Sequence, residues 1–157
     1  MTFKDIDEFK EAGFVGFKKM SDLFSDNSML PDVGGVYFVL NERPVVFLTT
    51  GSGGYFNGKN PNVSIEELSD NWVDKTKVVY IGKATSLKAR LRQYIRFGQG
   101  KNIGHYGGRY IWQLKYSCDL VVCWKTVINE EPGVVESSFI KLFTSVYSKR
   151  PFVNLKD

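Results

Sequence analysis

Two tyrosines and an arginine have the residue types and spacing that could bind a phosphate group. Tyr37 closes the motif GVY, and Tyr80 opens the motif YIG. Either tyrosine alone would normally be a core ring whose hydroxyl finds a local partner. The segment after Tyr80 is more informative, because Arg90 and Tyr94 lie four residues apart on one face of a predicted helix. Gly82, which has no side chain, would let backbone or a phosphate approach closely.

Four apolar runs rich in β-forming residues must position these side chains. They predict strands at residues 36–40, 45–49, 77–81 and 120–127. The turn signal at 41–44 predicts that the first two strands form a hairpin.

Helices are predicted between and beyond these strands. Apolar residues spaced by three or four over residues 3–30 predict one or two short helices. Ser64 is suited to cap a third helix, Thr85 or Ser86 a fourth, and Pro132 suits the first turn of a fifth. The alternation predicts an α/β or α+β fold, in which helices flank a small mixed or antiparallel central sheet of three or more strands.

These motifs and their order resemble the GIY-YIG nuclease superfamily. The resemblance rests on GVY at 35–37, YIGKATSLKARLRQY at 80–94, VESSFIKLF around Glu136, and KRPFVN ending at Asn154. It is nearest to the N-terminal nuclease domain of bacterial excision-repair incision subunits and looser to small GIY-YIG restriction endonucleases. It implies a metal-dependent DNA endonuclease that hydrolyses phosphodiester bonds.

The chain departs from the family pattern in two spacings. The two motif tyrosines lie farther apart than in compact members, so residues 44–75 are interpreted as an insertion. The gap between Glu136 and Asn154 is also longer than usual. The expected organisation is a single nuclease-like domain over 1–157, with a helical extension at 1–30.

The resemblance implies that Glu136 is the only protein ligand of a divalent metal. One carboxylate with waters and phosphate oxygens suits Mg²⁺, or Mn²⁺ in its place. Tyr37 or Tyr80 would be the general base for the attacking water, with Tyr37 preferred and Tyr80 holding water and phosphate. A free phenol has a pKa of about 10, which a cation cluster of metal, Lys83 and Arg90 would have to lower.

Three further roles are implied by the resemblance. Arg90 would donate paired hydrogen bonds to the scissile phosphate and stabilise the charge of the transition state. Tyr94 would orient the leaving oxygen or a bound water. Asn154 would be structural, tying the C-terminal tail to the site.

The distribution of charge points to DNA as the partner. Residues 75–118 contain ten Lys or Arg residues and no Asp or Glu, although the net charge of the whole chain is only +4. Such a concentrated positive field suits nucleic acid. The residues expected to contact nucleic acid are Lys88, Arg92, Arg96, Lys101, His105 and Arg109.

Hydrophobicity and cysteine usage indicate the cellular compartment in which the protein acts. No run approaches the roughly 18 apolar residues of a membrane span, and the first residues do not resemble a signal peptide. Cys118 and Cys123 are five apart in a predicted strand, so they should face opposite ways and stay unpaired. Free thiols predict a reducing cytoplasm.

Two alternatives to an autonomous nuclease stay open. One is a non-catalytic nucleic-acid-binding module that retains the nuclease fold, and it rests on the basic stretch alone. The other is a subunit whose partner supplies targeting, with residues 1–30 as the interface; a homodimer is left open as well.

Overall fold

A four-stranded antiparallel sheet forms the centre of the molecule, with its strands in the order β1-β4-β2-β3. The computed structural model describes residues 1–155. The strands are β1 (Val15–Lys19), β2 (Gly35–Leu40), β3 (Val78–Ala84) and β4 (Val121–Thr126). The predicted class is confirmed, and the antiparallel pairing makes the fold α+β.

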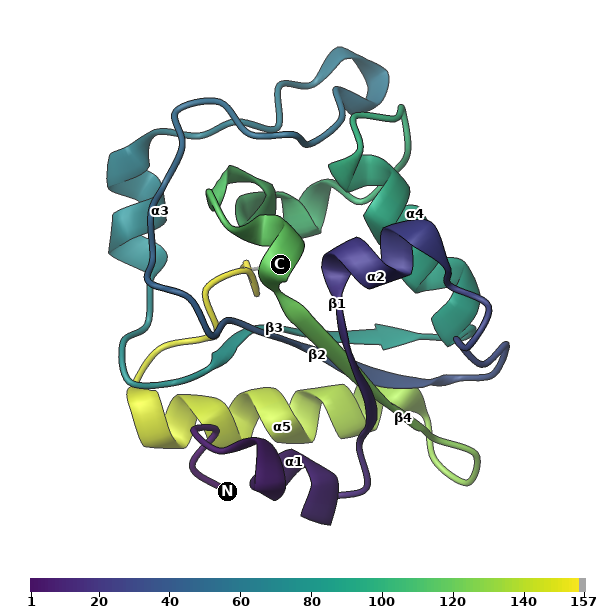
Figure 1. Cartoon of the computed structure of the whole chain (residues 1–157). Coiled ribbons are helices and arrows are strands. Elements are labelled where there is room, and N and C mark those ends of the chain that lie inside the picture. The colour runs from purple at the N-terminus through teal and green to yellow at the C-terminus, as the bar shows by residue number, and fades with distance from the viewer. Residues whose placement is uncertain (156–157) are drawn as a thin grey trace.

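Helices cover both faces of this sheet (Figure 1). Helices α1 (Ile6–Glu11) and α5 (Pro132–Tyr147) lie on one face, and α2 (Met20–Ser25) and α4 (Leu87–Gly98) lie on the other. Helix α3 (Ile65–Asn71) stands to one side. Short 3-10 segments at 56–58, 106–113 and 117–119 complete the chain between these elements.

The predicted helix starts are confirmed at the level of single hydrogen bonds. The Ser64 hydroxyl accepts from the backbone N–H of Glu67 at the start of α3. At the start of α4, Ser86 accepts from Ala89 at 3.1 Å. Each hydroxyl satisfies a donor that the first turn of a helix leaves without an intrahelical partner. Pro132, which lacks an N–H, occupies the first turn of α5.

Strand β2 contributes to two separate cores, because successive side chains of a strand face opposite sides. Phe38 packs among the aromatic rings beneath α1 and α5. Tyr37 and Val39 join the core beneath α2 and α4. All six residues of β2 are buried, so its position is fixed from both sides.

The hairpin predicted between residues 36–40 and 45–49 is wrong. Strand β2 is paired along both of its edges, with β3 on one side and β4 on the other, so no edge remains for a third partner. Residues 45–49 instead run as a loop whose Phe47 makes a single bridge to Leu114. Two backbone hydrogen bonds, from Leu48 to Gln113 and from Lys115 to Val46, hold this loop in place.

The helical prediction for residues 3–30 missed strand β1. The bulge between Gly16 and Lys18 adds one residue to the usual two-residue alternation, so the spacing resembles a helix. Gly16 has a φ of +96°, and a Cβ there would lie 2.4 Å from the Trp124 ring of β4. The glycine therefore lets β1 pack closely on its neighbour, where we expected a break between helices.

Across residues 1–155, no helix is both long and apolar enough to cross a membrane. The two cysteines are unpaired, as expected, with Cys118 exposed and Cys123 buried.

Candidate active site

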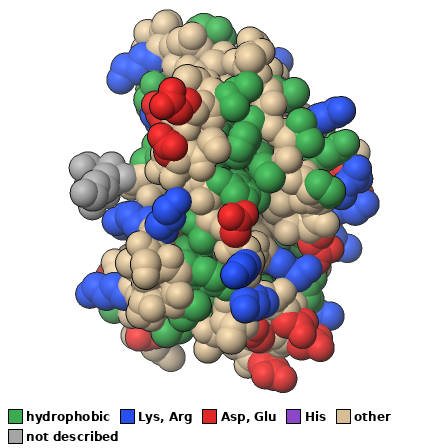
Figure 2. Space-filling model, turned by 90° about the vertical axis from the view of Figure 1, so that its left-hand side faces the viewer, with side chains coloured by type: hydrophobic (Ala, Val, Ile, Leu, Met, Phe, Trp, Pro, Cys, Tyr) green, Lys and Arg blue, Asp and Glu red, His purple; other side chains and the backbone are tan. Residues whose placement is uncertain are grey.

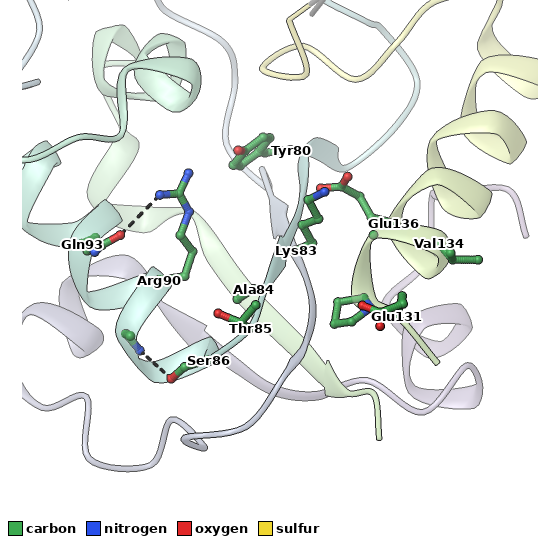
Figure 3. A pocket seen from close by; sticks show the side chains of 13 residues that line it. Tyr80, Lys83, Ala84, Thr85, Ser86, Arg90, Gln93, Glu131, Val134 and Glu136 are labelled. Atoms are coloured by element: carbon green, nitrogen blue, oxygen red, sulfur yellow. Dashed lines mark hydrogen bonds between the residues drawn. The ribbon is translucent and has the colours of Figure 1, made fainter. Parts of the chain in front are cut away.

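A hollow of about 690 Å³ with both polar and apolar lining opens between the start of α4 and the start of α5, beside the end of β3. We call it the main hollow. Figure 3 shows Arg90 reaching into it from α4 and Glu136 from α5, with Tyr80 of β3 between them. The structure thus brings together four of the expected site residues, Tyr80, Lys83, Arg90 and Glu136, from three different elements. The other lining residues are Ala84, Thr85, Ser86, Ala89, Gln93, Glu131, Pro132, Gly133 and Val134.

The two motif tyrosines are neighbours with different access to this hollow. Their ring centroids lie 5.8 Å apart, with the planes at 77°. Tyr80 is partly exposed and lines the main hollow. Tyr37 is fully buried behind it, and its hydroxyl has no hydrogen-bond partner within residues 1–155. Tyr80 is therefore the phenol that a ligand would meet.

Gly82 makes room for Tyr37. The two residues are directly paired across β2 and β3. A Cβ on Gly82 would lie 2.2 Å from Cζ of the Tyr37 ring, so any side chain there would displace the phenol. The close approach that Gly82 permits is thus made by Tyr37, where we had expected backbone or a phosphate.

Burial dominates the acidity of both phenols. It raises the pKa of Tyr37 well above its ordinary value, the charge of Tyr80 adds to this, and Arg90 opposes it. Burial also raises the pKa of Tyr80, while the Arg90 guanidinium again opposes it. Arg90 lowers both pKa values, as expected, but desolvation of a phenolate outweighs this attraction, so the protein's own groups leave both values raised.

Arg90 is held over the hollow by its own helix. Its Nη1 donates to the Gln93 side-chain oxygen at 3.3 Å, one turn further along α4 (Figure 3). Arg90 is half-buried, and its charge affects the pKa of Tyr37, Tyr80 and Tyr94 alike. Gln93 was not among the predicted site residues, although its position three residues after Arg90 on a helix could have indicated it.

Lys83 and Glu136 face each other across the opening. Figure 3 shows the exposed Lys83 side chain extending from β3 toward the Glu136 carboxylate. A Cβ on Gly133 would lie 3.1 Å from Lys83 Nζ, which places this amine against the first turn of α5. The negative charge of Glu136 reaches the phenols as well, since it raises the pKa of both Tyr37 and Tyr80.

The donor set around Glu136 fits a hydrated divalent cation. Within the described part of the chain, no three His, Cys, Asp or Glu side chains gather as a metal cage. A single carboxylate in a hollow with room for water is the kind of site that suits Mg²⁺, which keeps several of its waters. Glu136 therefore remains the residue that would hold such an ion.

Tyr94 and His105 stand behind Tyr80 and support its ring. The two rings stack with their centroids 3.9 Å apart. The centroid of the Tyr80 ring lies 5.5 Å from that of Tyr94 and 6.3 Å from that of His105, with the planes steeply inclined. The Tyr94 hydroxyl donates to the Gly108 carbonyl at 2.7 Å and lies in the interior. The contact expected between Tyr94 and a leaving oxygen or water does not fit this geometry.

The expected contact of His105 with nucleic acid is also corrected. Its side chain is 1% exposed, and neither ring nitrogen has a hydrogen-bond partner within residues 1–155. Burial lowers the pKa of His105 to about 3, with the Arg90 charge adding to the effect, so the ring is neutral near pH 7. Its place is in the wall behind Tyr80.

Asn154 has the structural role that was predicted for it. Its side-chain amide donates to the Ile81 carbonyl at 2.7 Å and accepts from the Ile81 N–H at 2.9 Å. Val153 adds a backbone bond to Val79 at 2.8 Å. Since β3 is the edge strand of the sheet, the tail takes the place of a neighbouring strand and fixes the backbone next to Tyr80.

The basic residues predicted to bind nucleic acid are spread more widely. Arg92, Arg96 and Lys101 are exposed, and Lys88 is half-buried. None of these four lines the main hollow, so in this geometry they could act only around it. Arg109 lines a different hollow, formed with residues of the C-terminal tail.

Comparison with models of protein families, with curated proteins and with solved structures finds no match to this chain. The resemblance to GIY-YIG nucleases is therefore carried by the motifs themselves.

Proposed function

We propose that this protein is a Mg²⁺- or Mn²⁺-dependent DNA endonuclease that hydrolyses a phosphodiester bond in the main hollow. One observation carries the proposal. Tyr80, Arg90 and Glu136 come from β3, α4 and α5, yet all three side chains line the main hollow. A phenol, a guanidinium and a carboxylate together supply what phosphate hydrolysis needs: orientation of water, charge stabilisation and a metal ligand.

Arg90 would bind the scissile phosphate. Its planar guanidinium can donate two parallel hydrogen bonds to non-bridging oxygens, and Gln93 already holds it in place. As water attacks phosphorus and the bond to the leaving oxygen breaks, negative charge builds up on these oxygens. A donor fixed in advance stabilises that charge without reorganisation.

Glu136 would hold the metal ion. When bound, the ion supplies positive charge to the phosphate and makes a coordinated water more acidic. Lys83, which extends toward the same carboxylate, would add a second positive charge at the opening.

Tyr80 is our choice for the group that positions the attacking water and receives its proton. Only Tyr80 of the two motif tyrosines lines the main hollow, whereas Tyr37 is fully buried. This reverses the preference for Tyr37 that the sequence alone suggested. Burial opposes formation of the phenolate, and Arg90 favours it, so the base role depends on a further cation at Glu136.

DNA is the proposed substrate class because the site lies among Lys and Arg residues. Lys88, Arg92 and Arg96 on α4 form no salt bridge within residues 1–155 and could contact the backbone of a bound duplex. Such contacts make affinity fall with salt. The free thiols of Cys118 and Cys123 support a cytoplasmic setting.

The direct test is cleavage of supercoiled plasmid by the purified chain with Mg²⁺, Mn²⁺ or EDTA. Wild type should convert the plasmid to nicked or linear DNA only with metal. Glu136→Gln should lose this activity and keep its DNA affinity. Glu130→Gln, an isosteric change at an exposed position outside the main hollow, should cut like wild type. Equal cutting by wild type and Glu136→Gln would overturn the proposal.

A non-catalytic nucleic-acid-binding module is the second candidate. One observation favours it: Lys88, Arg92 and Arg96 on α4 form no salt bridge within residues 1–155, and binding through them needs none of the geometry of the main hollow. Binding of plasmid, branched and single-stranded DNA without cleavage under any metal would support this function instead.

A further inference from the structure

A second hollow of about 610 Å³ lies beside the C-terminal tail, and neither Glu136 nor Arg90 lines it. We call it the flanking pocket. Three segments that are distant in the sequence form its walls: Asp70 and Asn71 from the insertion, Arg109 and Tyr110 from the 106–113 segment, and Lys149 and Arg150 from the tail.

The flanking pocket and the main hollow both border a third, smaller hollow of about 270 Å³. It shares Tyr80 and Glu136 with the main hollow, and Arg150 and Asn154 with the flanking pocket. A chain molecule bound at Glu136 could therefore extend into the flanking pocket without leaving the surface of the protein.

Arg109 is set up in this pocket as a rigid cation. Its guanidinium lies over the Tyr106 ring at 4.1 Å and over the Tyr110 ring at 5.3 Å. One Nη donates to the Tyr106 carbonyl at 3.1 Å, and the buried Nε has no partner within residues 1–155. Stacking on two rings fixes the plane of the guanidinium and leaves further N–H donors for a ligand.

The tail contributes two more cations, Lys149 and Arg150, and each is held by hydrogen bonds to backbone carbonyls. Lys149 Nζ donates to the carbonyls of Asp70 and Trp72 at 3.0 and 3.3 Å, which leaves one of its three N–H groups. Arg150 Nε donates to the Asn154 carbonyl at 3.0 Å. These bonds hold both side chains beside the pocket.

The opposing charge in the pocket is small. Asp70 is the only carboxylate among its lining residues, against the three cations Arg109, Lys149 and Arg150. Glu67 lies next to the pocket and accepts a hydrogen bond from the Tyr110 hydroxyl. None of the three cations forms a salt bridge with an acidic residue in the described part of the chain. Figure 2 shows Lys and Arg side chains on both sides of a strip of hydrophobic side chains, on the face where α3 lies.

We propose that the flanking pocket is a second phosphate-binding site, which holds a phosphate of the nucleic-acid strand next to the one that is cut. The proposal rests on the proposed nuclease function, and it gives the 44–75 insertion a purpose. A planar guanidinium fork suits the tetrahedral oxygens of a phosphate. Anchoring a neighbouring phosphate would fix which bond lies over Glu136 and the direction in which the strand runs.

The test is direct binding of a short labelled DNA duplex by fluorescence anisotropy in EDTA, over a range of salt concentrations, followed by cleavage kinetics with Mg²⁺. Arg109→Gln should weaken binding roughly tenfold and lower the salt slope by about 1. Lys18→Gln removes the same charge from the opposite edge strand β1, and it should alter neither quantity beyond error.

A gain of affinity makes the test independent of damage to the fold. Asp70→Asn removes the only carboxylate that lines the pocket within residues 1–155, so it should tighten binding a few-fold. Asp74→Asn, an exposed site outside the pocket, should not. Strands with and without a 5′-phosphate then distinguish a terminal from an internal phosphate: a terminal site predicts tighter binding of the phosphorylated strand, and an internal site predicts equal binding.

The outcomes separate the two proposals. If wild type cuts DNA but Arg109→Gln and Asp70→Asn bind like their controls, the pocket proposal is overturned and the nuclease function stands. If wild type binds DNA without cutting it, the proposed nuclease function fails. The changes in affinity of Arg109→Gln and Asp70→Asn then decide by themselves whether the flanking pocket binds phosphate. A higher KM for Arg109→Gln at unchanged kcat supports binding of a phosphate outside the reacting group.

Discussion

Both faces of the sheet bury several aromatic rings, but the two faces differ in their buried polar atoms. On the α5 face, Phe38 contacts the rings of Phe9, Phe14 and Phe139 with centroids 4.6 to 5.2 Å apart. On the α4 face, the core includes Tyr37 and the ring of Tyr94 stacked on His105.

Unpartnered polar atoms accumulate on only one of these faces. Within residues 1–155, the buried side-chain atoms that lack a hydrogen bond belong to Tyr37, His105, Arg109 and Trp112. None of these residues belongs to the core beneath α5. A buried polar atom without a partner costs about 1–3 kcal/mol, so the α4 face gives up stability that the α5 face retains. Two of the four residues, Tyr37 and His105, pack their rings against Tyr80, so part of this cost falls in the wall behind Tyr80.

The largest effect expected from this contrast is on the α5 face. Phe38→Ala should lower the free energy of unfolding by about 3–5 kcal/mol, because the lost ring leaves a cavity among four other rings. Urea unfolding followed by circular dichroism measures this. Phe56→Ala, at a partly exposed position outside both cores, is the control and should cost much less. Similar losses for both variants would mean that the face under α5 is not the main source of stability.

The second largest effect should appear in activity rather than stability. Arg90→Ala should reduce kcat by about 10²–10³, since it removes a donor from the developing phosphate charge, and should leave the unfolding free energy nearly unchanged. Arg96→Ala on the same helix is the matched control: Arg96 is exposed and is proposed to contact the DNA backbone outside the main hollow, so its loss should raise KM and leave kcat nearly unchanged. Single-turnover cleavage measures the rates of both variants. An equal loss in the two variants would reduce Arg90 to one more surface cation.

Local features of this site could be predicted from the sequence. The Ser86 cap and the stripe of Leu87, Leu91 and Tyr94 depend on neighbours within a few residues, and α4 formed where they placed it. Asn154 was assigned its structural role through a motif whose order the chain keeps.

Burial and strand pairing could not be predicted in the same way. The burial of Tyr37 follows from its place in a predicted apolar strand, but His105 is buried by segments from elsewhere in the chain, which no local spacing indicates. The 45–49 run has the composition of a strand, but β2 already has two partners, which only the whole topology determines. The flanking pocket was missed for the same reason, since its walls come from three separate segments.

A smaller effect should arise from the neutral His105. Its pKa is about 3 in the folded chain, against about 6.5 unfolded, so the unfolded chain binds more protons between these values and stability falls as pH drops through this window. From pH 7 to pH 5.5 this group alone should cost about 1.2 kcal/mol, above the range where most carboxylates titrate.

His105→Phe, which keeps a ring against Tyr94, should remove that pH dependence. Urea unfolding at the two pH values measures the difference between wild type and the variant. The same loss of stability in both would show that another group is responsible.

The smallest expected effect on stability bears most directly on the assignment of the two tyrosines. Tyr37→Phe removes a buried hydroxyl that has no partner within residues 1–155, so the free energy of unfolding should stay the same or rise by up to about 1 kcal/mol. Because Tyr37 does not line the main hollow, kcat should fall less than about tenfold, whereas Tyr80→Phe should lose about 10²–10⁴ if Tyr80 is the base. Thermal melts and single-turnover cleavage of the two variants give both quantities. A loss of activity in Tyr37→Phe as large as in Tyr80→Phe would instead support Tyr37 as the general base. The unpartnered Tyr37 hydroxyl on the α4 face would then be explained by its role in catalysis.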